Sequence, residues 1–131
     1  ECGISFFAHK DIKSTLSKKF PANLDNKPML IPSSIASIHA PLLNWFDSHN
    51  IRPIITGEFD DTALMKAFGR GGSGIFTAPT PIAKEVEHEY GVTKIGSTKA
   101  IVESFYAITV ERKIVHPAVI AITENAKKLL F

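Results

Sequence analysis

Short clusters of β-favouring residues alternate with helical patterns along this chain, and that alternation limits the folds open to it. Strand-like clusters and amphipathic helical segments require a layered arrangement in which helices cover a sheet. Connections of this length favour βαβ units, whose strands run parallel. The sequence therefore predicts an α/β fold with a largely parallel sheet flanked by helices. Strands are expected at 4–8, 28–32, 52–59, 75–78, 92–95 and 105–110, and helices at 35–46, 61–68, 82–90 and 117–129.

Capping residues indicate where several of these helices begin and end. Asp60 or Asp61 precedes the second helix and is a typical N-cap. Thr80 followed by Pro81 has the order of an N-cap and a first helical residue. Gly91 stands where a helix would end in a left-handed residue.

Composition excludes several classes of protein. The chain has 131 residues, of which 44% are hydrophobic and 21% charged, which is typical of one globular domain and not of a disordered chain. A formal net charge of +2 is too small for a nucleic-acid footprint. A single cysteine excludes a disulfide framework. The sequence starts at Glu1 within a strand-like segment, so we expect a fragment of a longer protein.

No catalytic constellation is found in the sequence. The glycine-rich run at 69–74 follows a helix and precedes a strand, which is the reverse of the order in a phosphate-binding loop. The five histidines are scattered, without the short spacing of a metal site. Cys2 has no neighbouring base, and no Gly-x-Ser-x-Gly motif is present. We therefore expect a protein that is not an enzyme; a small α/β enzyme would require a nucleophile–base pair formed by the fold.

Polar side chains follow three of the predicted strands. Glu58, Asp60 and Asp61 come at the end of the third strand. Hydroxyl groups occupy the corresponding positions after two others, at Ser33-Ser34 and Thr77. Ligands of open α/β sheets bind at the carboxyl ends of the strands, so these residues form a candidate ligand-binding rim. The alternative is that they only cap the following helices.

Several sequence blocks resemble the effector-binding domain of LysR-type transcriptional regulators, and within that family a sodium-responsive activator of a sodium/proton antiporter gene. The resemblance covers nearly the whole chain. The blocks are Glu1-Cys2-Gly3-Ile4-Ser5-Phe6-Phe7, Leu42-Leu43-Asn44-Trp45-Phe46, Gly57-Glu58-Phe59-Asp60-Asp61, Ala63-Leu64-Met65-Lys66-Ala67-Phe68-Gly69, Ile75-Phe76-Thr77-Ala78-Pro79 and His116-Pro117-Ala118-Val119.

This resemblance implies a bilobal fold like that of periplasmic binding proteins. Residues 1–113 would form the second lobe, and 114–131 a C-terminal helix returning to a first lobe that is mostly absent. The fragment should then expose the apolar face of that helix, with Val119, Ile122 and Leu129. A winged helix-turn-helix domain outside this chain would bind DNA. The resemblance further implies a cytoplasmic homo-oligomer, a dimer or tetramer, with no cofactor and no membrane partner.

The resemblance also implies a ligand, namely a small inducer or a sodium or lithium ion. Effector contacts would come from Ser33, Ser34, Glu58, Phe59, Asp60, Asp61 and Thr77. Hard cations prefer oxygen ligands, which Glu58, Asp60 and Asp61 would supply. Helix N-termini favour anions, so an anionic small molecule is the alternative occupant. The alternative class of protein is a periplasmic-type solute-binding lobe.

Overall fold

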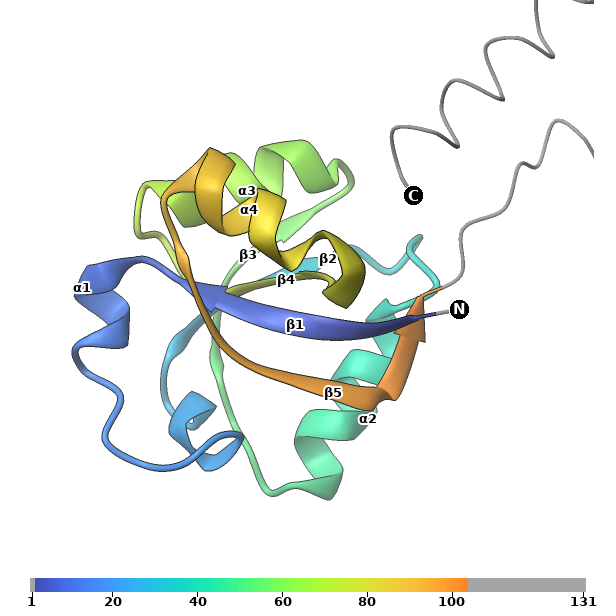
Figure 1. Ribbon diagram of the computed structural model, residues 1–131. Coiled ribbons are helices and arrows are strands. Elements are labelled where there is room, and N and C mark those ends of the chain that lie inside the picture. The colour runs from blue at the N-terminus through green and yellow to red at the C-terminus, as the bar shows by residue number, and fades with distance from the viewer. Residues whose placement is uncertain (1, 104–131) are drawn as a thin grey trace, which may run out of the picture.

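The computed structural model describes residues 2–103 (Figure 1). The strand predicted at 105–110, the helix predicted at 117–129 and the lobe boundary after residue 113 lie outside these residues. No helix within 2–103 combines the length and the apolar character needed to cross a membrane.

The strands form two sheets that an isolated bridge joins. The parallel pair is β2 (Pro28–Pro32) with β3 (Ile54–Phe59). In the other sheet β1 (Cys2–Ala8) lies between β4 (Phe76–Pro79) and β5 (Thr93–Glu103) and is antiparallel to both. A parallel bridge between Met29 and Ile75 places β2 beside the start of β4. Strands β2 to β5 therefore share one direction, as predicted, and β1 alone opposes them.

This topology brings strand ends that are distant in sequence to one edge of the sheet. Because β1 is reversed, its beginning lies beside the ends of the other strands, with Cys2 opposite Glu103 and Ile4 opposite Pro79. Pro32 is likewise opposite Phe59. We call this edge, with Cys2, Pro32, Phe59, Pro79 and Glu103, the tip edge.

Helices cover both faces of the strands (Figure 1). Helix α2 (His39–Ser48) lies on one face, and α3 (Thr62–Arg70) and α4 (Ala83–Tyr90) lie on the other. Short turns complete the fold: α1 (Lys10–Lys13), the 3-10 helix η1 (Ala22–Leu24) and the 3-10 helix η2 (Thr80–Ile82).

Alternation along β1 divides the core into two layers. Phe6 points to the α2 side, where its ring stacks on Trp45 at a centroid distance of 5.4 Å. Phe7 points to the other side, where it stacks on Phe76 at 5.5 Å beneath α3 and α4. Successive strand residues face opposite sides of a sheet, so one strand contributes to both cores. β1 is therefore the centre of the packing.

The structure corrects several predicted element bounds. Helix α2 begins at His39 and not at 35, because 33–38 forms turns, and Ile35 is 78% exposed instead of packed. Thr80 does not cap a helix: it opens η2, and its hydroxyl is hydrogen-bonded to Ser5. Strand β5 extends to Glu103, well past the predicted 92–95. Gly91 does end α4 in the left-handed region, with φ of 62°.

Candidate functional site

The end of β3 and the turn after β2 are joined at the tip edge. The Ser33 amide donates a hydrogen bond to the Phe59 carbonyl oxygen at 2.8 Å. This bond brings together two of the predicted effector residues, Ser33 and Phe59. Ser34 is adjacent in sequence and exposed.

The three carboxylates at the end of β3 have different roles. Asp61 is the N-cap of α3, and its Oδ1 accepts a hydrogen bond from the Ala63 amide at 2.8 Å. Glu58 and Asp60 are exposed, and their side chains make no hydrogen bond or ion pair within residues 2–103. Helix capping alone therefore explains Asp61, but it leaves the carboxylates of Glu58 and Asp60 available to a ligand.

Acidic, histidine and cysteine side chains do not gather into a metal site in the described part of the chain. No group of three or more such residues there is arranged to hold an ion. Glu58, Asp60 and Asp61 as sodium ligands stay a prediction.

Thr77 lies in a cavity of about 320 Å³ at the tip edge, which we call the tip cavity. The Thr77 side chain is only 3% exposed. Three further polar side chains line the cavity: Ser37 from the turn after β2, and Thr62 and Lys66 from α3. Of the predicted effector residues, only Thr77 is among the lining residues given for it.

The charge of the tip cavity favours an anionic or polar group. Lys66 is the one charged residue in its described lining. Thr62 is the first residue of α3, so the positive end of the helix dipole lies at the same place. Lys66 and Thr62 were not predicted, because the candidate rim was built only from residues that follow the strands. Their spacing of one helical turn, which puts both on one side of α3, could have indicated them.

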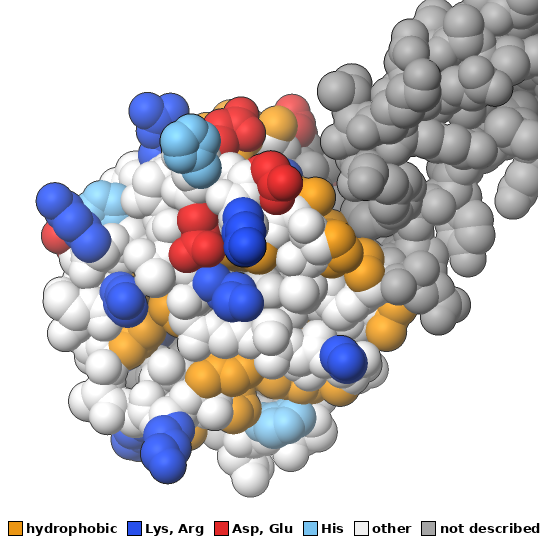
Figure 2. All heavy atoms as spheres, in the orientation of Figure 1, with side chains coloured by type: hydrophobic (Ala, Val, Ile, Leu, Met, Phe, Trp, Pro, Cys, Tyr) orange, Lys and Arg blue, Asp and Glu red, His pale blue; other side chains and the backbone are white. Residues whose placement is uncertain are grey.

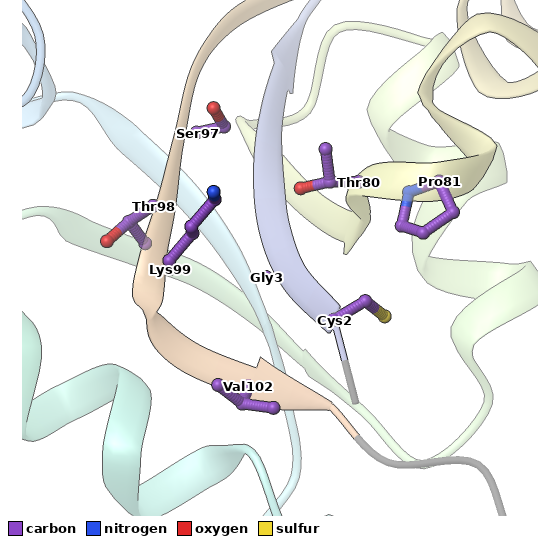
Figure 3. Close-up of a pocket in the computed structure, with 8 residues that line it drawn as sticks. All are labelled: Cys2, Gly3, Thr80, Pro81, Ser97, Thr98, Lys99 and Val102. Atoms are coloured by element: carbon purple, nitrogen blue, oxygen red, sulfur yellow. The ribbon is translucent and has the colours of Figure 1, made fainter.

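A larger cavity of about 710 Å³ lies beside the beginning of β1 and the end of β5 (Figure 3). We call it the β1–β5 cavity. Its walls come from β1, η2 and β5, and its lining is Cys2, Gly3, Thr80, Pro81, Ser97, Thr98, Lys99 and Val102. None of these was predicted as a site residue; those from β5 were missed because that strand was expected to end at 95.

Surface charge gives no basic patch on the face shown in Figure 2. Lys and Arg side chains are spread across it, and Asp and Glu lie among them in the upper part of the view. Hydrophobic side chains show in several places, among them the lower centre and the right of the view, where β1 begins and β5 ends.

Two glycines of the glycine-rich run and one histidine have structural roles in the described part of the chain. Gly69 lies within α3 against the Phe76 ring, and Gly72 adopts a φ of 86° in the turn to β4. Nδ1 of His39 is 2.8 Å from the Pro32 carbonyl oxygen, which attaches α2 to the end of β2.

Comparison with curated proteins relates the whole chain to a transcriptional activator. No protein-family model matches the sequence. The chain is 41% identical over 131 residues to the transcriptional activator protein NhaR of Escherichia coli, and equally to NhaR of Shigella flexneri. It spans 42% of the length of each of these relatives.

Solved structures share the fold. An effector-binding domain from Citrobacter freundii superimposes with a TM-score of 0.65 at 15% identity, over 99% of this chain and 65% of that one. The CcmR regulatory domain of Synechocystis, in complex with 2-PG, gives 0.61 at 14% identity over 95% and 64%. A periplasmic binding protein of Brucella ovis with glutathione bound gives 0.53 at 10% identity over 73% and 32%. These matches confirm the predicted α/β fold, like that of periplasmic binding proteins.

Proposed function

We propose that this chain, which is related to the LysR-family activator NhaR, is the effector-sensing lobe of a transcriptional activator. The observation that carries the proposal is the 41% identity to NhaR along the whole chain. The fold shared with effector-binding and regulatory domains supports it. The relatives are transcriptional regulators and not enzymes.

The tip edge suits a lobe that works against a second lobe. Cys2 pairs with Glu103, so the chain enters and leaves the described fold side by side at that edge. Two cavities and the predicted effector residues lie there too. A ligand held between two lobes can shift the balance between two lobe orientations only if it binds one orientation more tightly than the other. In the proposed mechanism this movement passes through a cytoplasmic homo-oligomer to winged helix-turn-helix domains on DNA.

The proposed inducer is a sodium or lithium ion, as the relation to a sodium-responsive activator suggests. Glu58 and Asp60 have carboxylates without a partner among residues 2–103, and these would supply oxygen ligands. Asp61 already caps α3 through one oxygen, which leaves its second oxygen for a cation. Ser33, Ser34, Phe59 and Thr77 would complete the effector contacts.

Hydrogen–deuterium exchange on the full-length protein tests this function. Sodium or lithium chloride should slow amide exchange in the peptide covering 57–62, whereas potassium chloride at the same ionic strength should not. Asp60→Asn should remove the effect, and Asp47→Asn, an exposed acid on α2, should retain it. An equal response to potassium would rule out cation sensing at these residues.

The second candidate function is that of a periplasmic solute-binding lobe, because the Brucella ovis binding protein shares the fold of this chain. The residues that precede Glu1 in the full-length protein distinguish the two functions. A winged helix-turn-helix there identifies a regulator, and a secretion signal identifies a solute binder.

A further inference from the structure

We propose that the end of the lobe opposite the tip edge contacts the phosphate backbone of double-stranded DNA through residues 10–27, which we call the basic segment. This contact adds to the DNA binding of the proposed winged helix-turn-helix domains, and it reads no base sequence. It rests on the proposed function, because those domains would bring the lobe to DNA.

Charge is distributed unevenly along the chain. The basic segment contains five lysines and two aspartates, which give it a net charge of +3. The whole chain has 15 basic and 13 acidic residues, so the residues outside the segment include 10 basic and 11 acidic ones, with a net charge of −1. The whole-chain charge of +2, which counts against a nucleic-acid footprint, therefore averages a basic segment with a slightly acidic remainder.

Strand topology places the basic segment at the edge opposite the tip edge. β1 ends at Ala8, which is paired with Thr93 at the beginning of β5. β2 begins at the same edge, where Pro28 is paired with Ile54 of β3. The basic segment connects β1 to β2, so both of its ends lie at this edge. In Figure 1 it follows the left and lower left border of the molecule from α1 onward.

Four lysines of the basic segment have ammonium groups without a partner in the described part of the chain. Their side chains are exposed and make no ion pair or hydrogen bond within residues 2–103; they are Lys10, Lys13, Lys18 and Lys19. The fifth lysine, Lys27, donates a hydrogen bond to the Thr15 carbonyl oxygen at 3.2 Å. Four positive charges are therefore available to an anionic partner.

The two aspartates of the segment do not neutralise these lysines. Asp25 Oδ1 accepts a hydrogen bond from the Arg52 amide at 2.8 Å. Asp11 Oδ2 lies 3.6 Å from His9 Nδ1. Neither aspartate forms an ion pair with a lysine within residues 2–103. Arg52 is itself exposed, and its carbonyl oxygen accepts a hydrogen bond from the Asn26 amide at 3.0 Å, so it adds a positive charge beside the segment.

Core packing holds the middle of the basic segment in place. The ring centroid of Phe20 lies 5.4 Å from that of Phe6 and 6.0 Å from that of Trp45. Lys18 and Lys19 directly precede this anchor. Because an ordered backbone loses less conformational entropy on binding, the two lysines are well prepared to hold a partner.

The arrangement of the cations suits a long polyanion. The lower left of Figure 2, the side on which the basic segment lies, shows Lys or Arg side chains and no Asp or Glu. These cations follow the border of the molecule and form no compact patch, which suits the extended row of phosphates along a duplex. Phe20 is the only aromatic residue of the segment, and it packs on the core instead of being free to stack on bases. Contacts of this kind go to phosphates, which position a protein without reading sequence.

Exposed lysines favour DNA over an acidic protein surface. An ion pair between an exposed lysine and an exposed carboxylate contributes little, because water and salt screen both charges. DNA differs because its phosphates hold condensed counterions, and each lysine that replaces one releases it into solution. The basic segment therefore gains more from a duplex than from a few carboxylates, and this gain depends steeply on salt.

Fluorescence anisotropy of the full-length protein tests the proposal. The probe is a labelled duplex of arbitrary sequence and about 60 base pairs, which extends beyond two half-sites one helical turn apart. Lys18→Gln combined with Lys19→Gln should reduce the slope of log affinity against log salt concentration by about 2, because each lost phosphate contact removes about 0.9. The matched control, Lys84→Gln combined with Lys99→Gln, removes the same charge from exposed lysines of α4 and β5 and should keep the wild-type slope. Both double variants should keep the wild-type midpoint of thermal unfolding, since all four side chains are exposed.

Lysine acetylation, measured by mass spectrometry, locates the contact. The duplex should slow the acetylation of Lys18 and Lys19 and leave that of Lys84 and Lys99 unchanged. Equal slopes in the two double variants, or no protection of Lys18 and Lys19, would overturn the contact alone. Protection by poly-L-glutamate but not by DNA would also overturn it and would assign the segment to an acidic protein partner. A wild-type protein that does not bind DNA would refute the proposed function together with the contact.

Discussion

Single residues at the end of β3 separate a structural role from a sensing role. Asp60 and Asp61 are adjacent in sequence, yet only Asp61 bonds a backbone amide of α3. The sequence predicted a cap at one of the two but gave no means to choose, because the choice depends on the backbone angles at the strand end. Asp61 is extended, with φ of −107° and ψ of 116°, as an N-cap requires.

Asp61→Ala should lower the free energy of unfolding by about 1 kcal/mol, because one amide of the first turn loses its acceptor. Asp60→Ala should change it by less than about 0.5 kcal/mol, since the side chain is exposed and contacts no partner in the described part of the chain. Urea unfolding of both variants measures the difference. If Asp60→Ala lost more stability than Asp61→Ala, Asp60 and not Asp61 would be the N-cap of α3.

At the scale of elements, prediction was accurate where local chemistry sets the bounds. Pro28 and Pro32 delimit β2 in the sequence and in the structure. The length of β5 was underestimated because it is a polar edge strand that extends only as far as it pairs with β1. For the same reason Lys99 could not be predicted as a site residue. Lys66 and Thr62 were missed because their cavity forms only when α3 packs beside β4.

Packing of α3 on β4 depends on Gly69. A Cβ at this position would overlap the Phe76 ring, so Gly69→Ala should destabilise the protein by about 1–3 kcal/mol. Gly71→Ala is the matched control: its φ is −77° and a Cβ there meets only ordinary contacts, so no loss of stability is expected. Denaturant midpoints compare the two. Equal midpoints would mean that α3 does not pack closely on Phe76.

On the scale of the whole molecule, the α/β class and the common strand direction were predicted correctly. The reversed direction of β1 was not predicted, since a single strand carries no local sign of its orientation. That orientation places Cys2 beside Glu103. It thereby collects at the tip edge residues that the sequence separates widely.

Glu103→Cys should form a disulfide with Cys2 on mild oxidation, because facing residues of an antiparallel pair have Cα atoms about 4.5–5.5 Å apart. Lys94→Cys should not, because Lys94 is opposite Phe7, at the other end of β1 from Cys2. Thiol titration and mass spectrometry read out the link. If both strands move as one body, the proposed sodium response should persist in the oxidised protein. Loss of that response on oxidation alone would mean that the two strands slide past each other.

The central position of β1 also has a kinetic consequence. It precedes every other described strand, yet its two neighbours in the sheet are β4 and β5. β1 can pair with both neighbours only after nearly all of the described chain has been synthesised. The chain between β1 and β5 must then close into one long loop. Such non-local pairing slows folding relative to a domain with local contacts. During that interval Phe7 lacks Phe76, the ring on which it stacks, whereas Phe6 can already pack on Trp45.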